Sequence, residues 1–84
     1  MLRAVATLRL FAQARQAAGV HRDDIDATTV GELLAIAEQR FGSTFSELLP
    51  VCRIWVDGAP AGADTAIGPS SEVAVLPPVS GGSR

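Results

Sequence analysis

The sequence predicts an α+β domain in which one amphipathic helix packs on one face of a mixed sheet. Short β-rich runs lie near both ends of the chain, and a strongly marked helix lies between them. The 84 residues are 48% hydrophobic and 19% charged. A chain of this length buries a little over about 60% of its unfolded surface, which suits one small core and argues against disorder. We expect residues 1–76 to form the domain and residues 77–84 an extended tail.

The chain begins with a predicted strand, helix and strand. Residues 4–11 form a short β-rich run that ends near Phe11. Residues 12–18 are rich in alanine and glutamine and favour a helix, which Gly19 ends as a C-terminal cap. Residues 21–26 alternate weakly around Ile25 and indicate a second, exposed strand with an acidic face. The two strands are expected to form a wide hairpin.

The main helix has the clearest signals in the chain. Thr29 and Glu32 match a capping box, in which a threonine hydroxyl and a glutamate three residues later satisfy each other's backbone donors. Apolar residues then recur at helical spacing until Gly42, which is expected to end the helix. Phe45, Leu48 and Leu49 are expected to add a short turn before Pro50.

The second half of the chain predicts further strands. Residues 51–56 form one strand, and Asp57 with Gly58 turns it. Residues 59–71 hold two prolines and two glycines, so they are expected to be a loop with a very short strand at 66–67. Residues 72–76 are the last strand, and Pro77 and Pro78 forbid further central pairing because neither can donate to the ladder.

Composition excludes several classes of function. The chain has a net charge of -2, seven arginines and no lysine, and it has no basic block, so nucleic acid is not an expected partner. An acidic domain suits a basic groove on another protein. The apolar runs are far shorter than the roughly 20 residues that span a membrane, and the first residues do not form a signal peptide. We expect a cytoplasmic protein that binds no membrane.

Single cysteine and histidine residues exclude a disulfide framework or a metal cluster within the chain. Cys52 lies beside Val51 and Ile54 and is expected to be a small buried hydrophobe. His21 lies among charged residues and is expected at the surface, and Trp55 in the core or half-exposed in the sheet.

The C-terminal tail is the chemically informative segment. Two prolines favour an extended conformation that rises about 3.1 Å per residue. The next residues shrink in size towards Gly81 and Gly82, and the reach from Leu76 to Gly82 is roughly 20 Å when extended. Glycine has no Cβ, so its backbone can closely approach a nucleophile or phosphate. A flexible, inert terminus is the simpler interpretation of the two glycines alone.

With these motifs in their order, the chain resembles the MoaD/ThiS family of ubiquitin-like sulfur carriers, most of all its molybdopterin-synthase branch. The resemblance rests on residues 10–15, 18–19, 29–34, 54–58 and 72–82. The ending from Pro77 to Gly82 is its most specific part, since thiazole-pathway carriers usually lack the proline pair. The resemblance implies a β-grasp fold.

The resemblance also implies a mechanism in which the chain is a cosubstrate without a catalytic site of its own. An E1-like enzyme would use ATP to adenylate the carboxylate of Gly82, and sulfur would then replace AMP to give a thiocarboxylate. The tail would enter the large subunit of molybdopterin synthase, in a possible heterotetramer, and donate sulfur to cyclic pyranopterin monophosphate. No cofactor is expected on the carrier itself. The implied partner-binding residues are Phe11, Arg15, Pro60, Leu76, Pro77, Pro78 and Val79.

Several alternatives remain open from the sequence. Phe11 and Leu76 also suit core positions at strand ends, and Arg15 also suits a solvated helix surface. Ser83 and Arg84 follow Gly82, which therefore has no free carboxylate until this pair is removed or shown to be foreign to the natural chain. The rival functions are a sulfur carrier for thiazole, cysteine or tRNA thiolation, a protein modifier, and an inert β-grasp interaction module.

Overall fold

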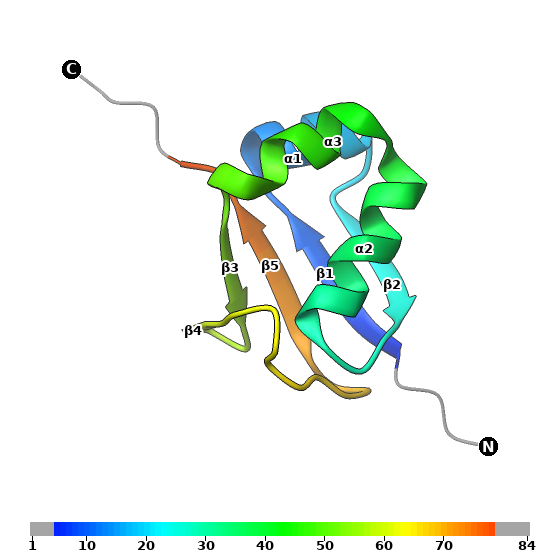
Figure 1. The fold of residues 1–84 in the computed structure, drawn as a ribbon, viewed down its shortest axis with the longest axis vertical. Helices are drawn as coiled ribbons and strands as arrows, with labels where there is room; N and C mark the ends of the chain where they lie inside the picture. The colour runs from blue at the N-terminus through cyan, green and yellow to red at the C-terminus, as the bar shows by residue number, and fades with distance from the viewer. Residues whose placement is uncertain (1–4, 79–84) are drawn as a thin grey trace.

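The first and last strands of the chain lie side by side at the centre of a mixed sheet (Figure 1). The computed structural model describes residues 5–78, whose five strands are ordered β2-β1-β5-β3-β4. β1 and β5 are parallel, and the other neighbouring pairs are antiparallel. This is the β-grasp arrangement that the resemblance predicted. The strands are β1 (Val5–Leu10), β2 (Arg22–Asp26), β3 (Arg53–Val56), β4 (Ala59–Pro60) and β5 (Glu72–Leu76).

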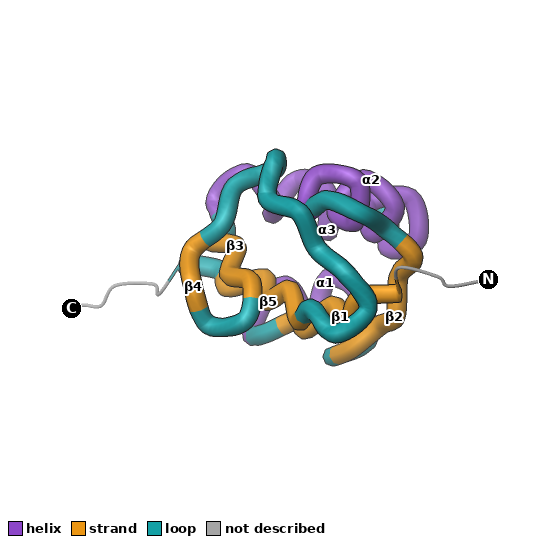
Figure 2. Tube along the Cα trace, turned by 90° about the horizontal axis from the view of Figure 1, so that it is seen from below, coloured by secondary structure: helices purple, strands orange, loops and turns teal. Residues whose placement is uncertain are grey.

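The longest helix and the helix that follows it lie over one face of this sheet, and the first helix lies at the end of the sheet beyond β1 (Figure 1 and Figure 2). The helices are α1 (Ala12–Ala18), α2 (Val30–Phe41), α3 (Ser43–Leu48) and the short 3-10 helix η1 (Leu49–Val51). We call the helix-covered side the closed face and the other side the open face. Among residues 5–78, each helix is too short or too polar to span a bilayer.

Alternation along the strands assigns each residue to a face. In β1, Leu8 and Leu10 are buried on the closed face, while Thr7 and Arg9 point to the open face. The parallel register places Leu8 opposite Val73 of β5, which is also fully buried. The core on the closed face consists of Ala6, Leu8, Leu10, Ala14, Ile25, Ala27, Val30, Leu33, Ala37, Phe45, Ile67, Val73 and Val75.

The predicted capping signal for α2 is confirmed, with one difference. The backbone N–H of Glu32 donates to Oγ1 of Thr29 at 3.1 Å, so Thr29 is the N-cap. The Glu32 carboxylate accepts from the backbone N–H of Thr28 at 2.7 Å, one residue earlier than a capping box predicts. Gly42, at φ 92°, ends the helix as expected.

The short turn predicted before Pro50 is a longer helical segment in the structure. The carbonyl of Gly42 accepts from the N–H of Ser46, and the chain forms the helix α3 and then η1. This second helix buries Phe45 completely and packs its ring edge-to-face on Phe41, with centroids 5.2 Å apart. Burial of an aromatic side chain stabilises the fold strongly, and this tertiary contribution is not visible in the local sequence.

The segment after β3 contains both a confirmed turn and a missed strand. Asp57 and Gly58 have φ of 51° and 86°, as a two-residue hairpin turn of this composition requires. The turn leads into β4, where a loop was predicted. β4 forms by pairing with β3. The prolines and glycines of residues 59–71 predict a loop, so this pairing could not be predicted from the local sequence. β3 itself begins at Arg53, because Val51 belongs to η1.

The remaining loop straps the start of α2. Ala66 forms a single antiparallel bridge with Thr29, in place of the short strand predicted at 66–67. The N–H of Gly31 donates to the carbonyl of Ala63 at 2.9 Å. A Cβ on Gly31 would lie 3.2 Å from that oxygen, so a larger residue would fit only if the backbone at Ala63 shifted slightly.

Candidate functional site

The tail leaves the sheet at the C-terminal end of β5. Leu76 pairs with Arg53 of β3, and on the other side the β1 register ends with Leu10 opposite Val75. Pro77 is half-buried and Pro78 is exposed. Because neither proline has a backbone N–H, the ladder cannot continue and the tail begins here, between the ends of β1 and β3 (Figure 1).

Phe11 lies beside this exit and is exposed, not a core residue. It directly follows β1, and 39% of it is accessible. The guanidinium of Arg9 lies 5.8 Å from the centroid of its ring, within the range of a cation–π contact. Ala12 next to it has φ of 50°, a left-handed conformation that alanine rarely adopts. This turn from β1 into α1 presents the Phe11 ring on the same face as Arg9.

The open face next to the exit is mostly apolar, although the exposed Arg53 of β3 lies on it opposite Leu76. Trp55 of β3 pairs with Ala74 of β5 on one side and with Pro60 of β4 on the other. Leu76 follows Ala74 by two residues and therefore shares its face. We call Phe11, Trp55, Pro60, Ala74 and Leu76 the open-face patch. Its residues are exposed or half-buried.

The open-face patch brings together three of the predicted contact residues, namely Phe11, Pro60 and Leu76. The sequence analysis did not assign Trp55 to it. The alternation along residues 53–56 could have assigned it, because Arg53 and Trp55 alternate with the aliphatic Ile54 and Val56. In the structure only Ile54 and Val56 pack against the core cluster.

Arg15 is not part of the open-face patch. It is exposed on α1, a helix that buries Ala14 and packs against α3. Its carbonyl accepts from the N–H of Gly19, whose left-handed φ of 82° ends the helix as predicted. Val51, which is 58% exposed, was not predicted as a surface residue, and it lies two residues before Arg53 at the exit end of the sheet.

The part of the tail that is predicted to carry sulfur lies outside the described residues. Val79, Gly81 and Gly82 all belong to this part, and their predicted roles stay predictions. The structure places only the start of the tail, Pro77 and Pro78.

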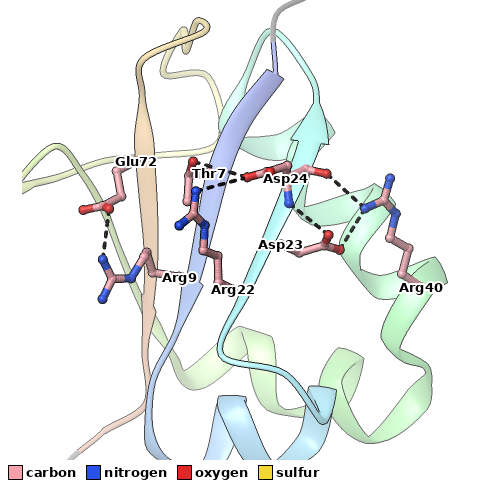
Figure 3. A network of polar contacts seen from close by, with 7 residues as sticks. All are labelled: Thr7, Arg9, Arg22, Asp23, Asp24, Arg40 and Glu72. Carbon is pink, nitrogen blue, oxygen red and sulfur yellow. Dashed lines mark hydrogen bonds and ion pairs between the residues drawn. The ribbon is translucent and has the colours of Figure 1, made fainter.

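The rest of the open face is ionic (Figure 3). Nη1 of Arg9 lies 3.2 Å from Oε2 of Glu72, which links β1 to β5. Oγ1 of Thr7 donates to Oδ1 of Asp24 at 3.4 Å, and Nη2 of Arg22 lies 3.9 Å from the same oxygen. We call these five residues the ionic half. Its charges have partners within the chain.

Two kinds of reaction centre, a metal cluster and an activated thiol, are absent from the described residues. Within residues 5–78, no group of three or more His, Cys, Asp or Glu side chains could hold a metal ion. Cys52 is half-buried, not fully buried as predicted, and its Sγ donates to the carbonyl of Leu48 at 3.4 Å. Burial raises the pKa of the Cys52 thiol above its ordinary value of 9.0, which disfavours the nucleophilic thiolate. What this end of the molecule offers is a mostly apolar surface beside the start of the tail, Pro77 and Pro78.

A β-grasp domain that presents a C-terminal peptide beside an apolar surface has the form of a ubiquitin-like carrier. The chain belongs to the ThiS family of ubiquitin-like sulfur carriers, which matches residues 8–82. That range includes the open-face patch and the predicted tail through Gly82.

Solved structures agree with this assignment. SAMP1 from Haloferax volcanii is 25% identical, with a TM-score of 0.83, covering 93% of this chain and 99% of that chain. A putative molybdopterin converting factor, subunit 1, from Pyrococcus furiosus is 25% identical, with a TM-score of 0.80, covering 90% and 99%. A chain in the complex of subunits 1 and 2 of the molybdopterin-converting factor from Helicobacter pylori is 25% identical, with a TM-score of 0.71, covering 93% of this chain and 99% of that chain. No curated protein matches the sequence.

Proposed function

We propose that this chain is the sulfur-donating small subunit of a molybdopterin synthase and acts in the cytoplasm. The carrying observation is that two prolines directly follow β5 beside the open-face patch, so a partner that binds the patch meets the start of the tail, Pro77 and Pro78, at a defined position. The ending from Pro77 to Gly82 favours this pathway over other sulfur carriers, and a converting-factor subunit from Pyrococcus furiosus is among the similar structures.

The first proposed step activates the tail. An E1-like enzyme binds ATP, and the carboxylate of Gly82 attacks the α-phosphorus, which forms an acyl-adenylate and releases pyrophosphate. A persulfide sulfur on a donor protein then attacks the acyl carbon and AMP leaves; reduction of the resulting acyl disulfide by a thiol gives the thiocarboxylate. ATP is needed because a carboxylate is a poor electrophile and AMP a good leaving group.

The second proposed step transfers the sulfur. The tail enters the active site of a large catalytic subunit, whose groups supply the acid and base chemistry. Sulfur passes to cyclic pyranopterin monophosphate, water supplies the replacing oxygen, and the carboxylate of Gly82 is restored. The carrier contributes reach and position: roughly 20 Å of extended peptide beyond Leu76, made stiff at its base by Pro77 and Pro78.

Docking on both partners would use the open-face patch. Burial of apolar side chains such as Leu76 and Phe11 supplies most of the free energy of such an interface, and the paired charges beside it fix orientation. Pro60 and Trp55 would extend the contact away from the exit. Arg15, on the helical side, would contact a partner only if that partner also reaches around the end of α1.

The proposal requires that Ser83 and Arg84 be absent from the active carrier, because an internal Gly82 has no carboxylate to adenylate. A protease that cleaves after Gly82 would meet this need. A matched pair of proteins, the full chain and a chain that ends at Gly82, separates processing from activation.

Intact-mass spectrometry tests the proposal directly. Both proteins are incubated with the cognate activating enzyme, ATP and a sulfur donor, and a chain with Gly82→Ala at its end serves as control. We expect the chain ending at Gly82 to gain the mass of one oxygen-to-sulfur exchange and then to lose it when large subunit and cyclic pyranopterin monophosphate are added. An unchanged mass, under conditions that convert a known family member, contradicts the proposal.

A protein modifier is the second candidate, favoured by the similarity to SAMP1. It would use the same adenylated tail but join it to an amine of another protein. The absence of lysine means that such a modifier could not build chains through its own side chains. Conjugates that survive reduction and carry the Gly82 carbonyl on a lysine would identify it. Retention of Ser83 and Arg84 in the native protein, with no conversion, would instead identify an inert interaction module.

A further inference from the structure

β2 is an outer strand of the sheet, so one of its edges pairs with β1 and the other is free. The hydrogen bonds to β1 show which backbone groups face the free edge. The N–H of Leu10 donates to the carbonyl of His21 at 2.9 Å, and the antiparallel register continues with Leu8 opposite Asp23. Backbone polar groups in an antiparallel pair face the partner strand at every second residue. The N–H and C=O of Asp24 therefore point away from β1, towards the free edge.

Both of these edge groups already have partners. The N–H of Asp24 donates to Oδ1 of Asp23 at 2.9 Å. The carbonyl of Asp24 accepts from Nη1 of Arg40, on α2, at 3.2 Å. The same Nη1 donates to Oδ2 of Asp23 at 2.8 Å, so the three residues form one closed cluster (Figure 3).

We propose that the free edge of β2 is a latent strand-addition surface for a second copy of this chain, and that the ion pair of Asp23 and Arg40 holds it closed. An exposed edge strand invites pairing with another strand, and proteins often block it with charged side chains. Here the two blocked groups are those that would form the centre of a two-fold antiparallel pairing between copies.

Charge supports a second copy as the occupant. Two-fold pairing centred on Asp24 places Arg22 of each copy opposite Asp26 of the other, and opposite charges across strands are favourable. Only Asp24 meets its own copy, a like-charge contact that opposes the pairing. The other edge of the sheet is β4, which has two residues and includes Pro60, so it offers a poor template.

The test is the double substitution Asp23→Ala with Arg40→Ala, which removes one charge of each sign and leaves the net charge at -2. Sedimentation equilibrium of the full chain should show a dimer dissociation constant at least tenfold lower than that of the unaltered chain. Adding Asp24→Asn should lower it further. In the dimer, hydrogen exchange at the Asp24 amide should slow as protein concentration rises.

A matched control combines Arg15→Ala with Glu47→Ala, two exposed positions on α1 and α3, which also preserves net charge and changes neither β2 nor Arg40. It should stay as monomeric as the unaltered chain. If the double variant unfolds, Arg40→Ala alone, at an exposed helix position, takes its place. Association no stronger than in the control, or association that leaves exchange at the Asp24 amide unchanged, overturns the proposal. Because it concerns β2 and not the tail, it stands or falls independently of sulfur transfer.

Discussion

The closed and open faces of the sheet come from the same strands, yet they do different work. Leu8 and Val73 on the closed face are fully buried by the helices. Trp55 and Leu76 on the open face keep part of their surface in water. Because successive residues of a strand alternate between faces, stability and partner binding can be changed almost independently in neighbouring residues.

A second contrast divides the open face itself. In the ionic half, Arg9 pairs with Glu72 and Thr7 with Asp24. These polar groups are stable while exposed to water, so covering them with a partner would gain little free energy. The open-face patch consists of apolar side chains, and covering it with a partner releases water from that apolar surface. We infer that the ionic half contributes orientation and the open-face patch contributes affinity.

The largest expected effect is on the closed face. Leu8→Ala should lower the free energy of unfolding by about 2–5 kcal/mol, because it leaves a cavity in a fully buried site. Thr7→Ala, the neighbour on the open face, should cost less than about 1 kcal/mol. Urea denaturation of the two variants measures both values. Equal losses would show that the two faces are not energetically distinct.

An intermediate effect is expected in the open-face patch. Leu76→Ala should weaken binding to the activating enzyme or the large subunit by about 1–2 kcal/mol, roughly five- to thirtyfold. Titration calorimetry measures the loss. Val20→Ala, at another exposed apolar position, is the matched control and should leave affinity unchanged. Binding that is insensitive to Leu76 would move the docking surface elsewhere.

The smallest effect is expected in the ionic half. A double-mutant cycle with Arg9→Gln and Glu72→Gln should give a coupling energy of about 0.2–1 kcal/mol, because both side chains of the pair are largely exposed. The coupling should shrink as salt is added. The cycle separates this pair from the contact of Arg9 with Phe11. A coupling that is larger and independent of salt would contradict the division of the open face.

Local signals predicted much of this fold because they act within a few residues. The capping residue Thr29, the stop at Gly42 and the turn at Asp57 and Gly58 were all identified from the sequence. The predicted end of the last strand at Leu76 was also right, since prolines cannot continue a ladder.

The missed features depend on contacts between distant segments. α3 forms because Phe45 finds a buried position against Phe41, and β4 forms because β3 offers it an edge. The left-handed backbone at Ala12 has no local signature, since alanine does not favour it. The composition of the open-face patch likewise required the register between strands that the sequence does not display.

The central place of β5 also bears on how the protein is made. Without its last strand the sheet would consist of two separate hairpins, β1 with β2 and β3 with β4, and isolated hairpins are marginally stable in water. A nascent chain can therefore complete its sheet only after residue 76 has left the ribosome. A product of premature termination that ends before residue 72 lacks the strand that joins the two hairpins, so it would not form a stable sheet.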